Sequence, residues 1–397
     1  MRILVLSFYY RPDLSAGSFR TTALVAALRD RLPPDSHVDV LTTLPHRYQS
    51  FSVEARPVEE QPGLCIRRFA LGYDGSGMAD QSLAFASFAR QVRKAAASKP
   101  YDVVFATSSR LMTAVLGAWV AGRAQAKLYL DIRDIFAETI GYILPGPRGA
   151  VARRASAMLE RYAVRRADKV NLVSPGFVDY FRARYPGQRF SCITNGIDDE
   201  FLEAGPAERR SLPRRAGPGT LSVTYAGNIG EGQGLHHILP PLAVRLGTRV
   251  HFTVIGDGGR RAALAEAVER ADATNVQLQP PVGRKALIEA YGQSDVLFLH
   301  LNDFAAFQRV LPSKVFEYGA MGKPMWAGVS GFAEQFVRSE IINAAVFRPC
   351  DVADAERSLD GLRLEETPRT AFVAKFGRDS ISEQLAQDVL SVAGDLR

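Results

Sequence analysis

The 397-residue sequence is poor in cysteine and has no long apolar run. Its cysteines, Cys65, Cys192 and Cys350, are widely spaced and form no CxxC pair, so they indicate neither a disulfide framework nor a zinc site. The apolar N-terminus ends at Tyr10, too early for a signal peptide, and no other segment has the roughly 18 uncharged apolar residues of a membrane span. We therefore expect a cytoplasmic protein that is soluble or peripheral on the inner face of the membrane.

The net charge of +7 and the pI of about 9.4 fit a nucleic acid partner, an anionic membrane or simply an arginine-rich composition. The sequence shows no helix-turn-helix, zinc or RNP-like motif, which argues against a nucleic acid partner. Two stretches, 148–169 and 85–94, place basic and apolar residues at helical spacing. Each predicts either an amphipathic helix on anionic lipid or a solvated basic face over an ordinary core.

Short apolar runs alternate with helical segments along the chain, which predicts an α/β fold of parallel sheets covered by helices. The length suits two domains. We expect one domain over 1–200, joined by a C-terminal helix at about 375–397, and a second over 201–374, with the linker in 198–220. The predicted strands are Met1–Ser7, His37–Thr43, Leu64–Ala70, Tyr101–Ser108, Lys127–Asp134, Lys169–Pro175, Leu221–Gly227, Val250–Gly258, Asn275–Val282, Asp295–Leu301 and Pro324–Val329.

Small and polar residues follow several of these strands. Gly17–Ser18 opens a helix after the first strand, and Gly227–Asn228 and Gly256–Gly258 end two successive later strands. Ligands of parallel α/β folds bind at the carboxyl ends of the strands, and glycine lets the backbone approach a phosphate closely. Gly17–Ser18 lacks the G-x-G-x-x-G pattern and fits a plain strand-to-helix turn equally well.

The most informative segment is LPSKVFEYGAMGKP, residues 311–324. Its first three residues predict a tight turn in which Ser313 caps the start of a helix. Lys314 adds a positive charge there, and Glu317 lies one turn further on the same face. The pattern suits a diphosphate-linked ligand that carries hydroxyl groups, although an ordinary amphipathic helix with one Lys–Glu pair would look the same.

Charged residues also gather after the predicted strand at Lys127–Asp134. Asp131, Arg133 and Asp134 are followed closely by Glu138. Holding these charges at the mouth of a parallel sheet is unfavourable unless they are paired or bind a ligand. Either a ligand site or a structural Arg–Asp pair explains the cluster.

In their order and spacing, six motifs resemble the retaining GT-B glycosyltransferases of family 4. They are FYYRPDLSAGSFRTTALVAAL, SPGF, ITNGID, YAGNIGEGQGL, VIGDG and LPSKVFEYGAMGKPMWAG. The last is similar to the form in bacterial N-acetylfucosamine and N-acetylglucosamine transferases of O-antigen and capsule synthesis. The resemblance implies two Rossmann-like, doubly wound domains that face a central cleft, the first presenting the acceptor and the second holding a UDP-sugar.

The resemblance also implies a role for each matching residue. The acceptor would be a saccharide linked to polyprenyl diphosphate, and the reaction would retain the sugar's configuration without a metal or a further cofactor. The implied donor-binding residues are Gly17, Ser18, Gly227 and Asn228 at the diphosphate, Gly256, Asp257, Gly258 and Val282 at the nucleoside, Glu317 at the ribose, Ser313 facing the phosphates and the sugar, and Leu311 and Pro312 in the same wall. The implied catalytic residues are Arg133, Asp134 and Lys314.

The chain departs from the family pattern at three places. Arg133 replaces a histidine, and Arg309 replaces the first glutamate of the E-x7-E motif that ends at Glu317. Glu231 and Gln233 stand where the family carries basic residues after the glycine turn. We expect Lys314 to neutralise the leaving phosphate instead. The alternatives are a catalytically silent GT-B partner protein and a nucleotide-sugar epimerase of the same fold.

Overall fold

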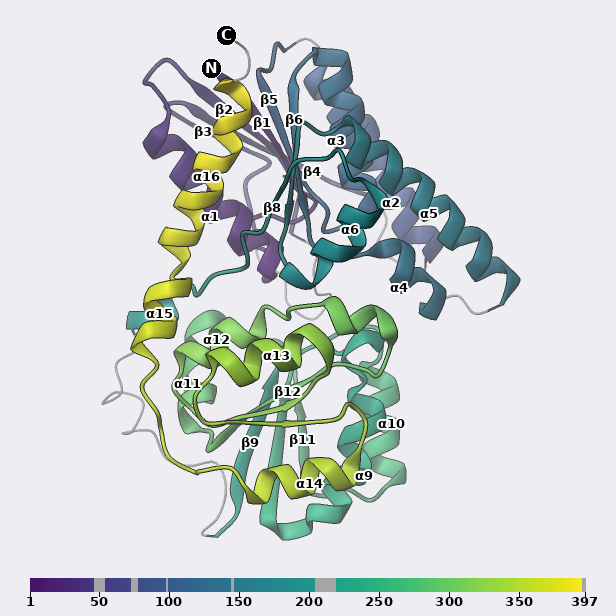
Figure 1. Ribbon diagram of the computed structural model, residues 1–397, viewed down its shortest axis with the longest axis vertical. Helices are drawn as coiled ribbons and strands as arrows, with labels where there is room; N and C mark the ends of the chain where they lie inside the picture. The colour runs from purple at the N-terminus through teal and green to yellow at the C-terminus, as the bar shows by residue number, and fades with distance from the viewer. Residues whose placement is uncertain (46–53, 73–77, 98, 144–145, 204–218, 395–397) are drawn as a thin grey trace. The chain divides into compact units, whose positions relative to one another are not determined.

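The computed structural model describes residues 1–45, 54–72, 78–97, 99–143, 146–203 and 219–394 (Figure 1). These residues form two compact units. The first comprises the described residues up to Gly196 together with Arg378–Gly394, and the second comprises those of Ile197–Gly377.

The chain passes between the units at Gly196–Ile197 and again at Gly377–Arg378. The Ile197 N–H donates to the Phe376 carbonyl at 2.7 Å, and Phe201 is buried in the core of the second unit. The expected linker at 198–220 therefore begins inside the second unit, because apolar side chains anchor its start. Residues 204–218 of that segment lie outside the described residues.

The first unit is built on a sheet whose strands are β1 (Arg2–Leu6), β2 (His37–Thr43), β3 (Val58–Gln61), β4 (Leu64–Phe69), β5 (Val103–Thr107), β6 (Lys127–Ile132), β7 (Lys169–Leu172) and β8 (Phe190–Ser191). Their order is β3-β4-β2-β1-β5-β6-β7-β8, and only β3 runs antiparallel to its neighbour. The order reverses between β1 and β5, which makes the carboxyl ends of these strands the expected ligand position of this unit. The sequence did not predict β3, whose VEEQ residues are mostly exposed at the sheet edge.

Helices cover this sheet. They are α1 (Ala16–Arg31), α2 (Met78–Ala96), α3 (Leu111–Ala124), α4 (Phe136–Ile143), α5 (Pro147–Arg166), α6 (Val178–Arg184) and α16 (Arg378–Gly394). Among the helices of the described ranges, none has the length and apolar character needed to cross a membrane.

The C-terminal helix α16 lies beside α1 on the first unit (Figure 1). Its apolar side chains Leu385, Val389 and Val392 are buried in the same core as β1 and β5. A polar anchor adds to this packing: the Asp388 carboxylate accepts hydrogen bonds from Tyr129 Oη at 2.5 Å, Lys169 Nζ at 2.5 Å and Ser191 Oγ at 2.6 Å. Despite partial burial, these donors hold the pKa of Asp388 below its usual value.

The second unit contains a wholly parallel sheet of β9 (Leu221–Ala226), β10 (Val250–Ile255), β11 (Val276–Gln279), β12 (Val296–His300), β13 (Met325–Gly328) and β14 (Ala344–Phe347), in the order β11-β10-β9-β12-β13-β14. Its helices are α7 (Glu200–Glu203), α9 (Leu235–Leu246), α10 (Arg261–Arg270), α11 (Arg284–Gln293), α12 (Lys314–Ala320), α13 (Gly331–Glu340), α14 (Val352–Asp360) and α15 (Thr370–Phe376). The strand order reverses between β9 and β12. The loop that follows β9 is therefore an expected ligand position of this unit.

The anchor of α16 generates a prediction for stability. Asp388→Asn should lower the free energy of unfolding of the first unit by about 1–3 kcal/mol at neutral pH, because charge-assisted hydrogen bonds are lost. The folded pKa lies below the unfolded value, so this contribution is present above about pH 4 and disappears as the pH falls below it. Urea unfolding at several pH values measures both effects.

The matched control is Glu383→Gln on the same helix, where an exposed ion pair with Arg31 should contribute less than about 0.5 kcal/mol. Equal losses in the two variants would contradict the anchor.

Candidate functional site

In the second unit, the loops after β9 and β10 touch at their glycines. The Gly227 N–H donates to the Ile255 carbonyl at 2.8 Å, and a Cβ atom on Gly256 would collide with the Gly227 carbonyl. Both glycines have positive φ, +137° and +154°, which side-chain-bearing residues rarely adopt. Two of the predicted clusters therefore meet at one place, and only glycine permits the approach.

Lys314 lies against this crossing. Its Cε and Nζ occupy the space that a Cβ atom on Gly227 would need, and Nζ is 5.1 Å from the ring centroid of Tyr225. Tyr225 in turn donates from its hydroxyl to the Asn228 carbonyl at 2.6 Å. The structure thus brings together Lys314, Gly227 and Asn228. Sequence reasoning missed Tyr225, because nothing in its strand distinguishes it from a core residue.

The expectation that Ser313 caps a helix is wrong. Ser313 already has helical backbone angles, φ −59° and ψ −28°, and its side chain makes no capping hydrogen bond. A capping residue needs an extended backbone to turn its oxygen toward the free N–H groups. Helix α12 also has only seven residues, so the positive charge at this point comes from Lys314.

Glu317 is held from outside its own helix. Arg284 donates to its carboxylate at 3.4 Å, as does the Tyr291 hydroxyl at 3.4 Å, and Arg284 also pairs with Asp198. Burial raises the pKa of Glu317 and is only partly offset by Arg284 and Lys314. The side chain is 18% exposed. No pattern in the sequence indicates that Arg284, on a different helix, reaches this carboxylate.

The remaining predicted residues of this unit have structural surroundings of their own. Leu311 is buried in the core beneath α12, and Val282 packs on the edge of that core. The Pro312 carbonyl accepts from the Val315 N–H at 3.1 Å. Asp257 accepts from the N–H of the adjacent Gly258 at 2.8 Å.

One group of side chains in the described residues offers ligand atoms to a metal ion. The carboxylate of Glu231 and the imidazoles of His236 and His237 place these atoms within 4.8 Å of one another. Arg260 forms an ion pair with the same Glu231 oxygen that faces His236. Because this pair already neutralises the carboxylate, we assign no metal to the group.

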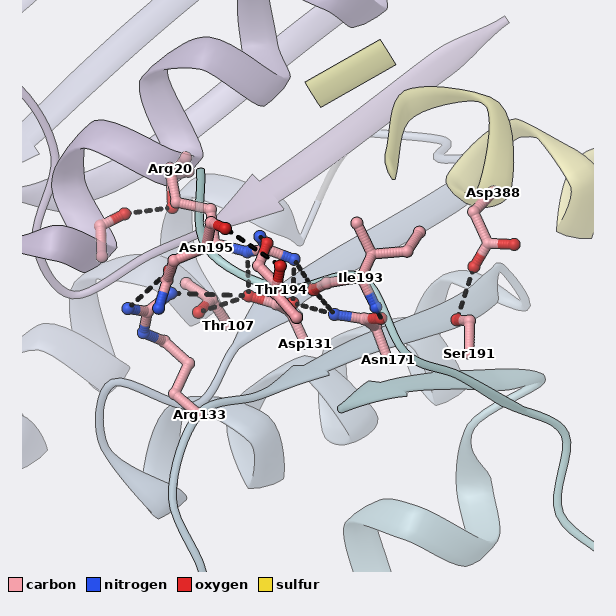
Figure 2. A network of polar contacts seen from close by, with 12 residues as sticks. Arg20, Thr107, Asp131, Arg133, Asn171, Ser191, Ile193, Thr194, Asn195 and Asp388 are labelled. Atoms are coloured by element: carbon pink, nitrogen blue, oxygen red, sulfur yellow. Dashed lines mark hydrogen bonds and ion pairs between the residues drawn. The ribbon is translucent and has the colours of Figure 1, made fainter. Parts of the chain in front are cut away.

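In the first unit, Asp131 at the end of β6 is the centre of a buried network (Figure 2). Arg20 of α1 donates to both of its oxygens, at 3.0 and 3.2 Å, while Asn171 donates at 2.8 Å and Thr107 at 3.3 Å. Burial favours the neutral acid, but Arg20 and Arg133 outweigh it and hold the pKa of Asp131 below its usual value. A structural Arg–Asp pair therefore exists: its closer arginine is Arg20, and Arg133 forms a longer ion pair with the same carboxylate.

Arg133 is the more distant arginine of this network. Its Nη1 is 4.0 Å from Asp131, is buried and has no hydrogen-bond acceptor, while Nη2 donates to Asn195 at 3.4 Å (Figure 2). Burial lowers the pKa of Arg133 to about 10, so the group is charged at neutral pH.

The first turn of α1 lies beside this guanidinium. A Cβ atom on Gly17 would be 3.6 Å from Arg133 Nε and 2.9 Å from Ser109 Oγ. The hydroxyls of Ser18 and Ser109 are buried without a hydrogen-bond partner. Gly17, Ser18 and Arg133 thus form one cluster of hydrogen-bond donors, whereas Asp134 is exposed.

The glycine crossing in the second unit generates a prediction. Gly227→Ala should cost about 2 kcal/mol or more in the free energy of unfolding of that unit, because alanine strains the backbone and displaces Lys314. Gly259→Ala is the matched control, since a Cβ atom there meets nothing within 4 Å and should change the free energy by less than about 0.5 kcal/mol. Urea unfolding of both variants decides the point, and equal small effects would contradict the close approach.

Comparison with known proteins identifies the fold. Residues 17–196 match the family model of the glycosyl transferase 4-like domain. No curated protein matches the sequence. Similar solved structures include Anabaena Alr3699/HepE in complex with UDP and glucose, with a TM-score of 0.69, 17% identity and coverage of 98% of this chain and 100% of that chain.

Two further structures extend the comparison. The catalytic domain of starch synthase IV from Arabidopsis thaliana, bound to ADP and acarbose, has a TM-score of 0.66 at 14% identity and covers 99% of each chain. WaaG, a glycosyltransferase of lipopolysaccharide biosynthesis, has a TM-score of 0.60 at 13% identity, with 99% of this chain and 98% of that chain covered. The chain therefore has the GT-B glycosyltransferase fold and, over residues 17–196, matches the glycosyl transferase 4-like domain.

Proposed function

We propose that the protein transfers a sugar, of the N-acetylated hexosamine class, from a UDP-sugar to a lipid-linked saccharide in the synthesis of a surface polysaccharide. The observation that carries the proposal is the position of Lys314 against the Gly227 turn in a GT-B fold. The ammonium group and the closely packed glycine backbone together suit a diphosphate. The UDP and UDP-glucose complexes of the similar HepE structures support the choice of nucleotide.

In this proposal, different residues of the second unit bind different parts of the nucleotide-sugar donor. Lys314 and the backbone at Gly227 and Asn228 bind the diphosphate. Glu317 accepts hydrogen bonds from the ribose hydroxyls, and Arg284, which donates to its carboxylate, offsets part of the rise in its pKa that burial causes. The turn at Gly256–Gly258 and the side chain of Val282 adjoin the nucleoside.

The chemical step we propose proceeds with retention. The acceptor hydroxyl attacks the anomeric carbon on the face from which UDP departs, the bond from this carbon to the diphosphate breaks, and the acceptor proton passes to the leaving phosphate. Negative charge therefore develops on the phosphate and positive charge on the sugar. Lys314 stabilises the phosphate without a metal, and Arg133 and Asp134 of the first unit act on the sugar.

Helix α5 suits a lipid-linked acceptor. Val151 and Met158 are 68% and 72% exposed, and Arg154 and Arg161 follow each of them by three residues on the same side of the helix. Exposed apolar side chains flanked by arginine fit the headgroup region of an anionic bilayer. Helix α2 does not share this property, because its predicted apolar face, including Phe85 and Phe88, is buried in the protein.

A catalytically silent GT-B protein is the second candidate. The observation in its favour is Arg309, which stands in place of the first family glutamate at the end of a short 3-10 helix, Ala305–Arg309. Incubation with a panel of nucleotide-sugars and a polyprenyl-diphosphate saccharide distinguishes the two. Only a transferase extends the lipid, while a silent protein binds the nucleotide without product and an epimerase converts the donor alone.

Lys314→Ala should lower the turnover number about 100-fold or more, because one preorganised charge at the leaving group is lost. The variant should keep its thermal unfolding midpoint, since Lys314 is not part of the apolar core. Lys285→Ala, an exposed lysine of α11, is the control and should turn over like the wild type. Near-normal turnover of Lys314→Ala would contradict the assignment of Lys314 to the leaving phosphate.

The membrane proposal predicts sedimentation with vesicles of phosphatidylglycerol at low salt and release at high salt. Reversing Arg154 and Arg161 to glutamate should abolish this binding. Reversing Arg90 and Lys94 of α2 changes the net charge equally and should leave most of it. Equal loss in the two double variants would show a non-specific charge effect instead of a surface on α5.

A further inference from the structure

The loop between β9 and α9 is held by hydrogen bonds to side chains that do not themselves bind the nucleotide-sugar in our proposal. Gln233 Oε1 accepts from Asn228 Nδ2 at 2.8 Å and from the Gly230 N–H at 3.1 Å. One glutamine side chain thereby sets the orientation of the Asn228 amide. Gln233 therefore links Asn228 and Gly230 within the turn that follows β9.

Gln233 is held by a buried histidine at the end of β12. His300 Nδ1 is 2.7 Å from the Gln233 carbonyl oxygen, and Nε2 is 3.0 Å from the Cys350 backbone nitrogen. The Cys350 N–H can only donate, so Nε2 accepts and Nδ1 carries the proton that it donates to Gln233. Burial lowers the pKa of His300 to about 4, which keeps the ring neutral and this tautomer in place at neutral pH.

Asn302 holds the rest of the loop. Its Nδ2 donates to the Glu231 carbonyl at 2.9 Å, and its backbone N–H donates to the Gly232 carbonyl at 2.9 Å. A Cβ atom on Gly234 would lie 2.9 Å from Asn302 Cγ, so the loop and this side chain are in close contact. Asn302 is 5% exposed, and loss of its amide would leave the Glu231 carbonyl without this partner.

We propose that His300 and Asn302 are positioning residues of the donor site. They hold the Glu231–Gly234 loop, which contains Gln233, and the Gln233 side chain fixes the Asn228–Gly230 turn whose backbone binds the diphosphate. The inference rests on the proposed UDP-sugar function and deepens it, since it assigns the preorganisation of the site to residues that touch no substrate. A site preorganised in this way avoids the cost of ordering the loop when the nucleotide binds.

The chain offers a matched control for this proposal in Asn275. Its Nδ2 donates to the carbonyls of Ala243, Gly247 and Val250 at 2.8–3.0 Å, so it also ties loops together with one amide. Val250 is the first residue of β10, whereas the glycine turn follows its last. Asn275 therefore acts at the amino end of the sheet, and its loss should reduce stability without reaching the donor site.

The test is calorimetric titration of UDP into the wild type and the variants Asn302→Ala, Asn302→Asp and Asn275→Ala. The dissociation constant should rise about tenfold or more in both Asn302 variants and stay within about twofold in Asn275→Ala. The KM for the donor should rise in parallel while kcat changes less than about threefold, because the loop binds the donor alike in the ground and transition states.

Wild-type affinity in the Asn302 variants, or an equal loss in Asn275→Ala, would overturn the positioning role while leaving the proposed function intact. Failure of the wild type itself to bind UDP would overturn both. The thermal unfolding midpoint of each variant is measured as well. It distinguishes a loss of binding from a loss of folding, because Asn302→Ala and Asn275→Ala should be destabilised to a similar degree.

Discussion

The close approach of the loops after β9 and β10 is the constraint on which the rest of the candidate site depends. Backbone meets backbone at Gly227 and Gly256, where any side chain would collide. Because Gly227 has no side chain, Lys314 can occupy the space beside it, and Asn228 directly follows this contact. The turn after β9 exists only because two glycines allow it. Its contacts include Lys314 and Tyr225, and the hydrogen bonds made by Gln233 and Asn302 hold the loop that follows it.

Much of the fold could be predicted from the sequence, because strands buried on both faces are continuous apolar runs. Val103–Thr107 and Val296–His300 are wholly buried, and both were predicted. The GT-B architecture followed from motif order and agrees with the similar structures. Strands β3, β8 and β14 escaped prediction. Strand β3 is polar and exposed at an edge, β8 has only two residues, and β14, AAVF, is only partly buried and has no alternating pattern.

The partners of the charged residues could not be predicted, since they come from distant parts of the chain. Asp131 pairs more closely with Arg20, at 3.0 Å, than with its near neighbour Arg133, at 4.0 Å, because α1 brings the Arg20 guanidinium to the end of β6. Glu317 forms an ion pair with Arg284 on a different helix. Lys314, which shares a helix face with Glu317, instead packs against Gly227. Residue spacing defines which side chains share a helix face, but tertiary packing decides which of them meet.

The central claim is that the second unit binds a uridine diphosphate through its own side chains and backbone. It is tested most directly by calorimetric titration of the intact chain with UDP in the presence of a metal chelator, with ADP as the comparison nucleotide. The account predicts saturable binding of one UDP per chain that is unchanged by the chelator. Binding that appears only after a divalent metal is added, or no binding of UDP at all, would contradict it.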